Sequence, residues 1–181
     1  MFRRASTFCG LLVAIAAGAA ACGPAVDLSK ALEVTDVLTG YYDDGVHQVD
    51  MNDGRGPIAA NKLKPSITMR LRNASDAEIT SVQIMASFWR ANTDGEWDSV
   101  LVNAVSSDGL PPGEKSAPIT LRTNTAYNVE GARMSLFTDH RFLDVTVRVF
   151  AKRAGGLYKL GEHKIDRVVL PHASGRGAPR P

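Results

Sequence analysis

Apolar and polar residues alternate in two runs of this chain, and that alternation constrains the fold more than any other feature. In the run 66–73, Ile67, Met69 and Leu71 alternate with polar residues, which puts apolar side chains on one face of an extended strand. The run 82–88 repeats the pattern with Val82, Ile84, Ala86 and Phe88. The polar residues 73–78 between the runs have the composition of a turn. The sequence therefore predicts two half-buried strands that pair as a hairpin.

Turn signals divide the rest of the chain into further short apolar runs. Asp94-Gly95 predicts a reversal, and the two prolines in residues 107–114 predict a loop, because proline cannot donate to a sheet. The predicted strands are 32–42, 46–51, 66–73, 82–88, 97–105, 119–121, 145–151, 157–160 and 165–170, with Asp43-Asp44-Gly45 between the first two. The stretch 126–137 has no clear pattern. Seven to nine short strands predict an all-β fold, an antiparallel β-sandwich of immunoglobulin type over residues 31–171.

The first 21 residues have the layout of an export signal. Arg3 and Arg4 form a basic start, and residues 8–21 follow without a charged side chain and close on three alanines. This apolar run holds 14 residues, whereas a helix that crosses the hydrocarbon core needs about 20. We therefore expect residues 1–21 to be a cleaved signal peptide.

Cys22 directly follows these small residues. The stretch Ala19-Ala20-Ala21-Cys22 resembles the lipobox of bacterial lipoproteins, although that family usually has leucine where Ala19 stands. The resemblance implies cleavage before Cys22 and lipid on its sulfur. Because Gly23 rather than aspartate follows, it also favours the outer membrane in a host with two membranes. The other cysteine, Cys9, lies in the segment to be removed, which leaves Cys22 without a disulfide partner.

Without its signal peptide the chain has the length of one domain and no net charge. Residues 22–181 number 160, and 19 basic side chains balance 19 acidic ones once Arg3 and Arg4 are removed. Such a chain has no field that would attract nucleic acid. We expect residues 22–30 to form a lipidated tether and the Gly- and Pro-rich residues 172–181 to form a disordered tail.

A second resemblance covers residues 64–123. It consists of a strand that ends in Leu71-Arg72-Asn73-Ala74-Ser75, a strand that ends in Phe88-Trp89, the turn Asp94-Gly95 and the loop Leu110-Pro111-Pro112-Gly113-Glu114. These features are similar to the FxLYD-type immunoglobulin-like domains of bacterial envelope lipoproteins. Trp89-Arg90 stands where the family has the Tyr-Asp of its name. The resemblance implies an adhesion or assembly module, and it carries over no active site.

Residues with catalytic or metal-binding chemistry are scattered along the chain. No histidine has a second histidine at metal-ligand spacing, and neither a nucleophile-elbow motif nor a phosphate-binding loop occurs. The Asp-rich segment 43–53 offers oxygen ligands for calcium, but its spacing departs from the EF-hand, and we favour turn-forming residues as the explanation. We predict no metal site and no cofactor, and calcium binding by residues 43–53 stays open.

Phe88, Trp89 and Trp97 are the candidate interface residues. In a regular strand only one of two adjacent aromatic side chains enters the core, so the other meets solvent or a partner. We expect a non-catalytic, membrane-anchored module that binds another protein of the bacterial envelope or supports an assembly. The alternative is a carrier or sensor that holds a small ligand or ion, which a deep apolar pocket with convergent polar groups would favour.

Overall fold

The computed structural model describes residues 26–50, 54 and 56–170. Its elements are α1 (Leu28–Ala31), β1 (Leu32–Asp50), β2 (Pro57–Asn73), β3 (Val82–Arg90), β4 (Asp98–Val105), β5 (Ile119–Arg122), β6 (Tyr127–Val129), the 3-10 helix η1 (Arg133–Thr138), β7 (Val145–Arg153), β8 (Gly156–Lys164) and β9 (Val169–Leu170). No helix of this part of the chain is long and apolar enough to cross a membrane. Cys22, the predicted signal peptide 1–21 and the predicted tail 172–181 lie outside the described residues.

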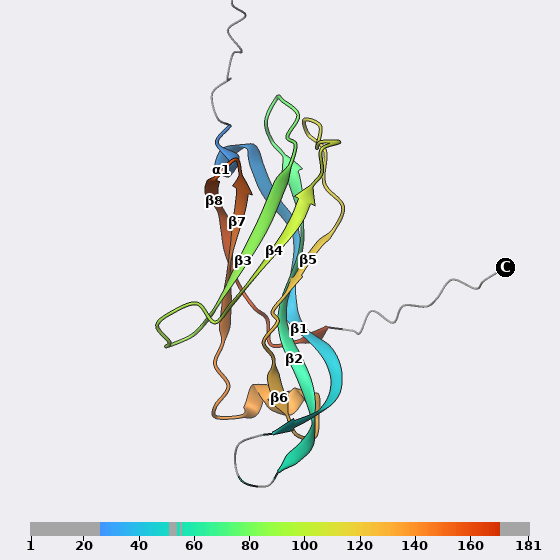
Figure 1. Ribbon diagram of the computed structural model, residues 1–181, viewed down its shortest axis with the longest axis vertical. Helices are drawn as coiled ribbons and strands as arrows, with labels where there is room; N and C mark the ends of the chain where they lie inside the picture. The colour runs from blue at the N-terminus through green and yellow to red at the C-terminus, as the bar shows by residue number, and fades with distance from the viewer. Residues whose placement is uncertain (1–25, 51–53, 55, 171–181) are drawn as a thin grey trace, which may run out of the picture.

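Two sheets pack face to face (Figure 1). One has the strand order β5-β2-β1-β9, with β6 also paired to β2, and the other has the order β4-β3-β7-β8. The pairs are antiparallel except for β1 and β9, which run parallel. The order β4-β3-β7-β8 corresponds to the C′-C-F-G sheet of an immunoglobulin-like sandwich. The predicted fold class, an antiparallel β-sandwich of seven to nine strands, is confirmed.

The core lies between the sheets and follows the predicted alternation. From β2, the side chains of Ile67, Met69 and Leu71 point inward and are fully buried. The opposite sheet contributes further fully buried residues, which are Ile84, Ala86 and Phe88 of β3 and Val145, Val147 and Val149 of β7. Because burial of one large aliphatic or aromatic side chain contributes about 1.5–3 kcal/mol, this layer is the main source of stability.

The predicted hairpin between residues 66–73 and 82–88 is wrong, because β2 and β3 lie in different sheets. Asn73, fully buried at the end of β2, organises the crossing between the sheets. Its amide donates to the carbonyl oxygens of Ala77 and Leu110, both at 2.8 Å, and its side-chain oxygen accepts the backbone N–H of Ser75 at 2.9 Å. Strands that face each other across a core show the same alternation as strands that pair, so the pattern does not separate the two arrangements.

β1 is one continuous strand where the sequence predicts two. Asp43-Asp44-Gly45 forms a β-bulge and not a reversal, because the register with β2 shifts between Asp43 and Val46 while the pairing continues to Asp50. A second bulge, between Thr35 and Leu38, contains Asp36 at a φ of 54°. Bulges bend a strand and redirect its side chains without ending it. β1 therefore stays in the sheet along β2.

The folded domain begins inside the segment predicted as a tether. Asp27 caps α1 by accepting the backbone N–H of Ser29 at 3.1 Å, and Leu28 is fully buried in the core. At the other end, the hydroxyl of Thr39 donates to Asp166 at 2.9 Å. Both ends of the described chain are thus fixed next to β1, and the domain starts at residue 27 and not at 31.

The stretch 126–137, which has no clear sequence pattern, contains β6 and most of η1. These elements close the end of the sandwich that lies away from α1 (Figure 1). An aromatic cluster fills this end, with ring centroids 5.2–6.2 Å apart, and consists of Tyr41, Tyr127, Phe137 and Phe142. Burial raises the pKa of the Tyr41 hydroxyl far above its ordinary value. The cluster gives the β6 end a hydrophobic core of its own.

Candidate interaction surface

The β4-β3-β7-β8 sheet places apolar side chains on its outer surface. The register puts Leu101 of β4 beside Met85 of β3, and Met85 beside Phe150 of β7. Leu157 of β8 pairs with Lys152, two residues beyond Phe150, and is therefore its diagonal neighbour. We call Leu101, Met85, Phe150 and Leu157 the apolar stripe.

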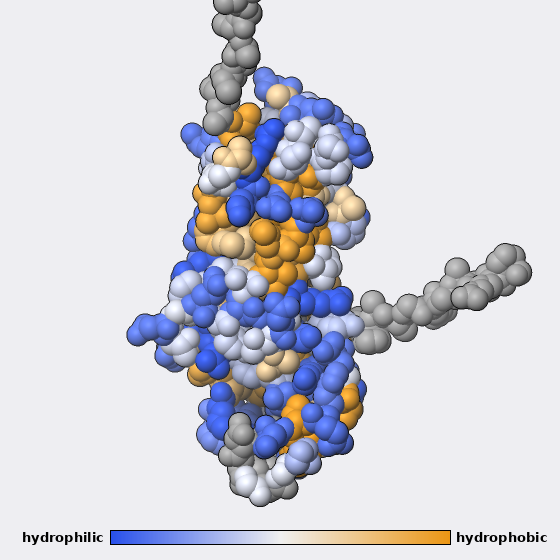
Figure 2. Space-filling view, viewed as in Figure 1, coloured by the Kyte–Doolittle hydropathy of each residue, from blue (hydrophilic) through white to orange (hydrophobic). Residues whose placement is uncertain are grey.

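The apolar stripe is open to solvent. Leu101 is 46% exposed and Leu157 is 53% exposed, while Met85 and Phe150 are half-buried. Figure 2 shows apolar side chains gathered in the half of this surface that lies toward α1, and mostly polar ones in the half toward β6. Single exposed apolar residues are ordinary, but a contiguous row across four strands marks a contact surface.

In the polar half of the same surface, the side chains bind one another. Trp89 donates its indole N–H to the hydroxyl of Ser87 at 2.6 Å, and Ser87 donates to the carboxylate of Glu96. The guanidinium of Arg148 covers the Trp89 ring at 4.3 Å from its centroid. The apolar area that is left uncovered therefore belongs to the stripe.

Cations surround the apolar stripe. Arg148, Lys152, Lys159 and Lys164 extend from the same outer surface. Glu162 is shared, with one carboxylate oxygen 2.8 Å from Nζ of Lys159 and 3.4 Å from Nε of Arg148, and the hydrogen bond from Lys159 lowers its pKa. Lys152 has no ion pair within the described residues. The surface thus carries more positive than negative charge around its apolar centre.

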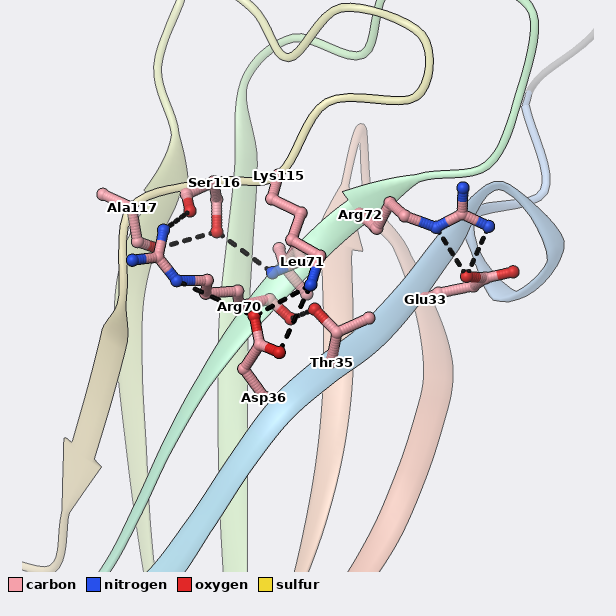
Figure 3. A network of polar contacts seen from close by, with 9 residues as sticks. All are labelled: Glu33, Thr35, Asp36, Arg70, Leu71, Arg72, Lys115, Ser116 and Ala117. Atoms are coloured by element: carbon pink, nitrogen blue, oxygen red, sulfur yellow. Dashed lines mark hydrogen bonds and ion pairs between the residues drawn. The ribbon is translucent and has the colours of Figure 1, made fainter.

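The outer surface of the other sheet is charged and internally paired. Figure 3 shows side chains from β1, β2 and residues 115–117 turned toward one another. Nε of Arg72 donates to Glu33 at 2.9 Å, Nζ of Lys115 donates to Asp36 at 3.0 Å, and Arg70 donates to the Ser116 carbonyl at 2.7 Å. We call Glu33, Asp36, Arg70, Arg72 and Lys115 the charged face. Its two carboxylates pair with its three cations within one chain.

The structure does not bring the three predicted interface aromatics together. Phe88 is fully buried, so its prediction as an interface residue is wrong. It lies on the core side of β3, and Trp89 takes the outer side because successive residues of a strand alternate. Trp97 packs against the core, with its ring centroid 5.0 Å from that of Tyr127. Of the three, Trp89 alone borders the surface that carries the stripe.

Trp97 lines a second candidate site, a cleft of about 360 Å³ at the β6 end. The guanidinium carbon of Arg90 lies 5.3 Å from the centroid of the Trp97 ring, and no carboxylate pairs with Arg90 among the described residues. The hydroxyl of Tyr127 donates to the Leu143 carbonyl at 2.9 Å, and burial raises its pKa to about 12. Aromatic rings and a guanidinium without a carboxylate suit a small anionic or sugar-like molecule.

The Asp-rich segment uses its described carboxylates within the protein. Asp43 forms an ion pair with Arg133, and Asp44 lies 2.9 Å from Nζ of Lys64, whose hydrogen bond lowers the pKa of Asp44. Asn52 and Asp53 lie outside the described residues. In the part of the chain that the structure describes, no three His, Cys, Asp or Glu side chains are grouped as metal ligands.

The sequence signal for the apolar stripe consists of apolar residues at positions where the alternation calls for polar ones. Met85 occupies a polar position of the run 82–88, and Leu101 interrupts the polar side of β4. Such exceptions to alternation place apolar residues on the outer side of a strand. No protein-family model matches the chain, and no curated protein is significantly similar to it in sequence. The function is therefore argued from the chain's own residues.

Proposed function

We propose that this protein is an exported lipoprotein, held to a membrane of the bacterial envelope by lipid on Cys22. Its sandwich binds another envelope protein and catalyses no reaction. The observation that carries the binding proposal is the apolar stripe, which stays exposed although the neighbouring Ser87, Trp89 and Glu96 are hydrogen-bonded to one another.

The anchor is supported by the sequence before Cys22 and by the short distance to the fold. Leu28 is already part of the core, so few residues separate the lipid from the sandwich. A burial of about 0.8 kcal/mol per methylene makes two or more acyl chains a lasting attachment. Labelled palmitate should enter the wild-type chain and not the Cys22→Ser variant, which should leave the membrane fraction with its fold intact. Wild-type protein without label contradicts the anchor.

The surface defines the partner by its chemistry. An apolar centre with an excess of lysine and arginine around it complements a protein surface with apolar side chains and a rim of carboxylates. Of the four cations beside the apolar stripe, Lys152 is the one without an ion pair within the described residues. We therefore expect an acidic envelope protein, whose association weakens as salt rises.

The test compares the two outer surfaces of the sandwich. Tagged chains are recovered from detergent-solubilised envelopes, with Met85→Glu as the test variant and Thr68→Glu as its control on the outer side of β2. The proposal expects one partner in stoichiometric amount with wild type and Thr68→Glu, and loss of that partner with Met85→Glu. Equal recovery by both variants, or no stoichiometric partner with wild type, contradicts it.

A small-ligand carrier is the second candidate, and the cleft beside Arg90 and Trp97 favours it. Acidic monosaccharides such as glucuronate match a guanidinium next to aromatic rings. Under this hypothesis glucuronate raises the thermal midpoint of wild type, and Arg90→Ala removes the rise. An unchanged wild-type midpoint eliminates this ligand class.

A further inference from the structure

The edge strand β4 differs from the other sheet edges of the described residues. β5 has four residues and β9 has two, while β1 is interrupted by two bulges. β8 carries Lys159, Glu162 and Lys164 and has a register shift opposite Val149 and Phe150. Short length, charge and bulges are the means by which edges avoid pairing with another chain. β4 has eight residues, DSVLVNAV, with one charge at its beginning.

The backbone of β4 turns hydrogen-bonding groups to its free side. The N–H of Ser99 lies on this side and donates to the carboxylate of Asp98 at 2.8 Å. Because backbone groups alternate between the two sides of an antiparallel strand, Leu101 and Asn103 also turn their N–H and C=O groups to the free side. A groove of about 320 Å³ beside the end of β4, lined by Ala104 and Val105 among others, leaves room there.

The sequence of β4 is nearly palindromic about Leu101. Val100 mirrors Val102, Ser99 mirrors Asn103, and Asp98 mirrors Ala104. A twofold axis at Leu101 would therefore set Val100 opposite Val102 and Ser99 opposite Asn103 of a second copy, with no like charges opposed. Such self-complementarity is what a twofold contact between identical chains requires.

We infer that β4 pairs antiparallel with β4 of a second copy, with Leu101 opposite Leu101 of the other chain. The contact joins two four-stranded sheets into one of eight strands and adds about four backbone hydrogen bonds, donated by Leu101 and Asn103 of each copy. It also brings the two apolar stripes edge to edge, because Leu101 is the end of each stripe at the β4 side. The resulting surface is twice as long as that of one copy.

The pairing is compatible with the proposed lipid anchor. The twofold axis of an antiparallel pair within one sheet runs along the sheet normal, so the two chains leave α1 at opposite ends of the dimer. Both anchors reach one membrane when the sheets lie parallel to it. This orientation rests on the proposed function, whereas the pairing itself does not.

The pairing can be tested without lipid, on the full chain with Cys9 and Cys22 replaced by serine. Leu101→Cys should form an interchain disulfide on mild oxidation, because Cα atoms of a hydrogen-bonded pair lie about 5.5 Å apart. The matched control is Asn103→Cys, whose two copies would lie about 14 Å apart along the strands. Crosslinking of both variants alike, or of neither, overturns the register.

Mass measurement by light scattering decides whether a dimer exists at all. The cysteine-free chain should be a dimer whose dissociation constant rises at least tenfold in Leu101→Lys and changes less than threefold in Leu157→Lys, an equally exposed leucine on the opposite edge strand. A single-chain mass up to about 0.5 mM overturns the inference, since that range covers even weak contacts. Circular dichroism on each variant confirms that the sandwich is retained.

Discussion

The outer surfaces of the two sheets differ in whether their side chains find partners within the chain. On the charged face, Glu33 and Asp36 meet Arg72 and Lys115 of the same chain, so the surface is complete without a partner. On the β4-β3-β7-β8 sheet, Leu101 and Leu157 meet solvent, and β4 is an eight-residue edge strand with one charge. Charged residues that pair within the chain have their interactions satisfied without a partner. Exposed apolar area and an unprotected edge, by contrast, are stabilised by contact with another protein. We therefore propose that the β4-β3-β7-β8 sheet binds the partner and that the charged face stabilises the fold.

The largest expected effect is the difference in stability between a substitution on the core side of β3 and one on its outer side. Phe88→Ala should lower the free energy of unfolding by about 4 kcal/mol, because it empties a fully buried aromatic site. Trp89→Ala, one residue along, should cost about 1 kcal/mol, since it removes a half-buried ring and one hydrogen bond. Urea denaturation measures both. Equal losses would show that the outer side of β3 is packed as a core.

The next effect concerns binding through the apolar stripe. With the purified envelope partner, Phe150→Ala should weaken association about thirtyfold, which corresponds to about 2 kcal/mol for a central aromatic contact. Thr68→Ala, on the outer side of the other sheet, should leave the affinity within a factor of two. Calorimetric titration compares them, and a larger loss for Thr68→Ala would reverse the assignment of the two surfaces.

A smaller effect belongs to the charged face. Asp36→Ala should lower the free energy of unfolding by about 1 kcal/mol, because Lys115 and Arg70 lose their shared carboxylate in a partly exposed network. It should leave partner binding unchanged. The control is Asp76→Ala in the exposed 74–81 connection, which should change stability by less than about 0.5 kcal/mol. Loss of partner binding in Asp36→Ala would mean that the charged face also binds.

The smallest effect is the acid dependence of one ion pair. Arg167 donates to the carboxylate of Asp144 and lowers its pKa below the ordinary value of 3.8. A lowered pKa means that the pair stabilises the fold above pH 3.8 and that this contribution disappears as the pH falls through the lowered pKa. Asp144→Asn should therefore reduce stability by less than about 1 kcal/mol at pH 7. Wild type and variant should converge in stability as the pH falls below that lowered pKa, and a constant difference at all pH values would assign the loss to packing.

Much of the fold follows from local patterns, and its connections do not. The alternation in residues 66–73 and 82–88 correctly predicts two strands, because burial of one face imposes a period of two. It does not predict that Asn73 carries the chain to the opposite sheet, since that crossing depends on hydrogen bonds to Leu110, 37 residues away. The bulge at Asp43-Asp44-Gly45 resembles a turn for a similar reason. These residue types favour both a turn and a bulge, and only the pairing with β2 determines which of the two forms.

Part of the candidate surface could be predicted from the sequence. Two adjacent aromatic residues at 88 and 89 predict that one is buried, but strand phase alone decides which, and Phe88 rather than Trp89 enters the core. Phe150 and Leu157 join Met85 and Leu101 only through the register of four strands. That register is tertiary information, which no single run of residues contains.

Photocrosslinking in living cells would decide whether the β4-β3-β7-β8 sheet is the binding side of the sandwich. A photoreactive benzoylphenylalanine is placed in living cells at Phe150, in the apolar stripe, or at Thr68, on the outer side of β2. If this sheet binds the partner, position 150 should give a discrete adduct with one envelope protein and position 68 should give none. An adduct from position 68 and none from position 150 would contradict it.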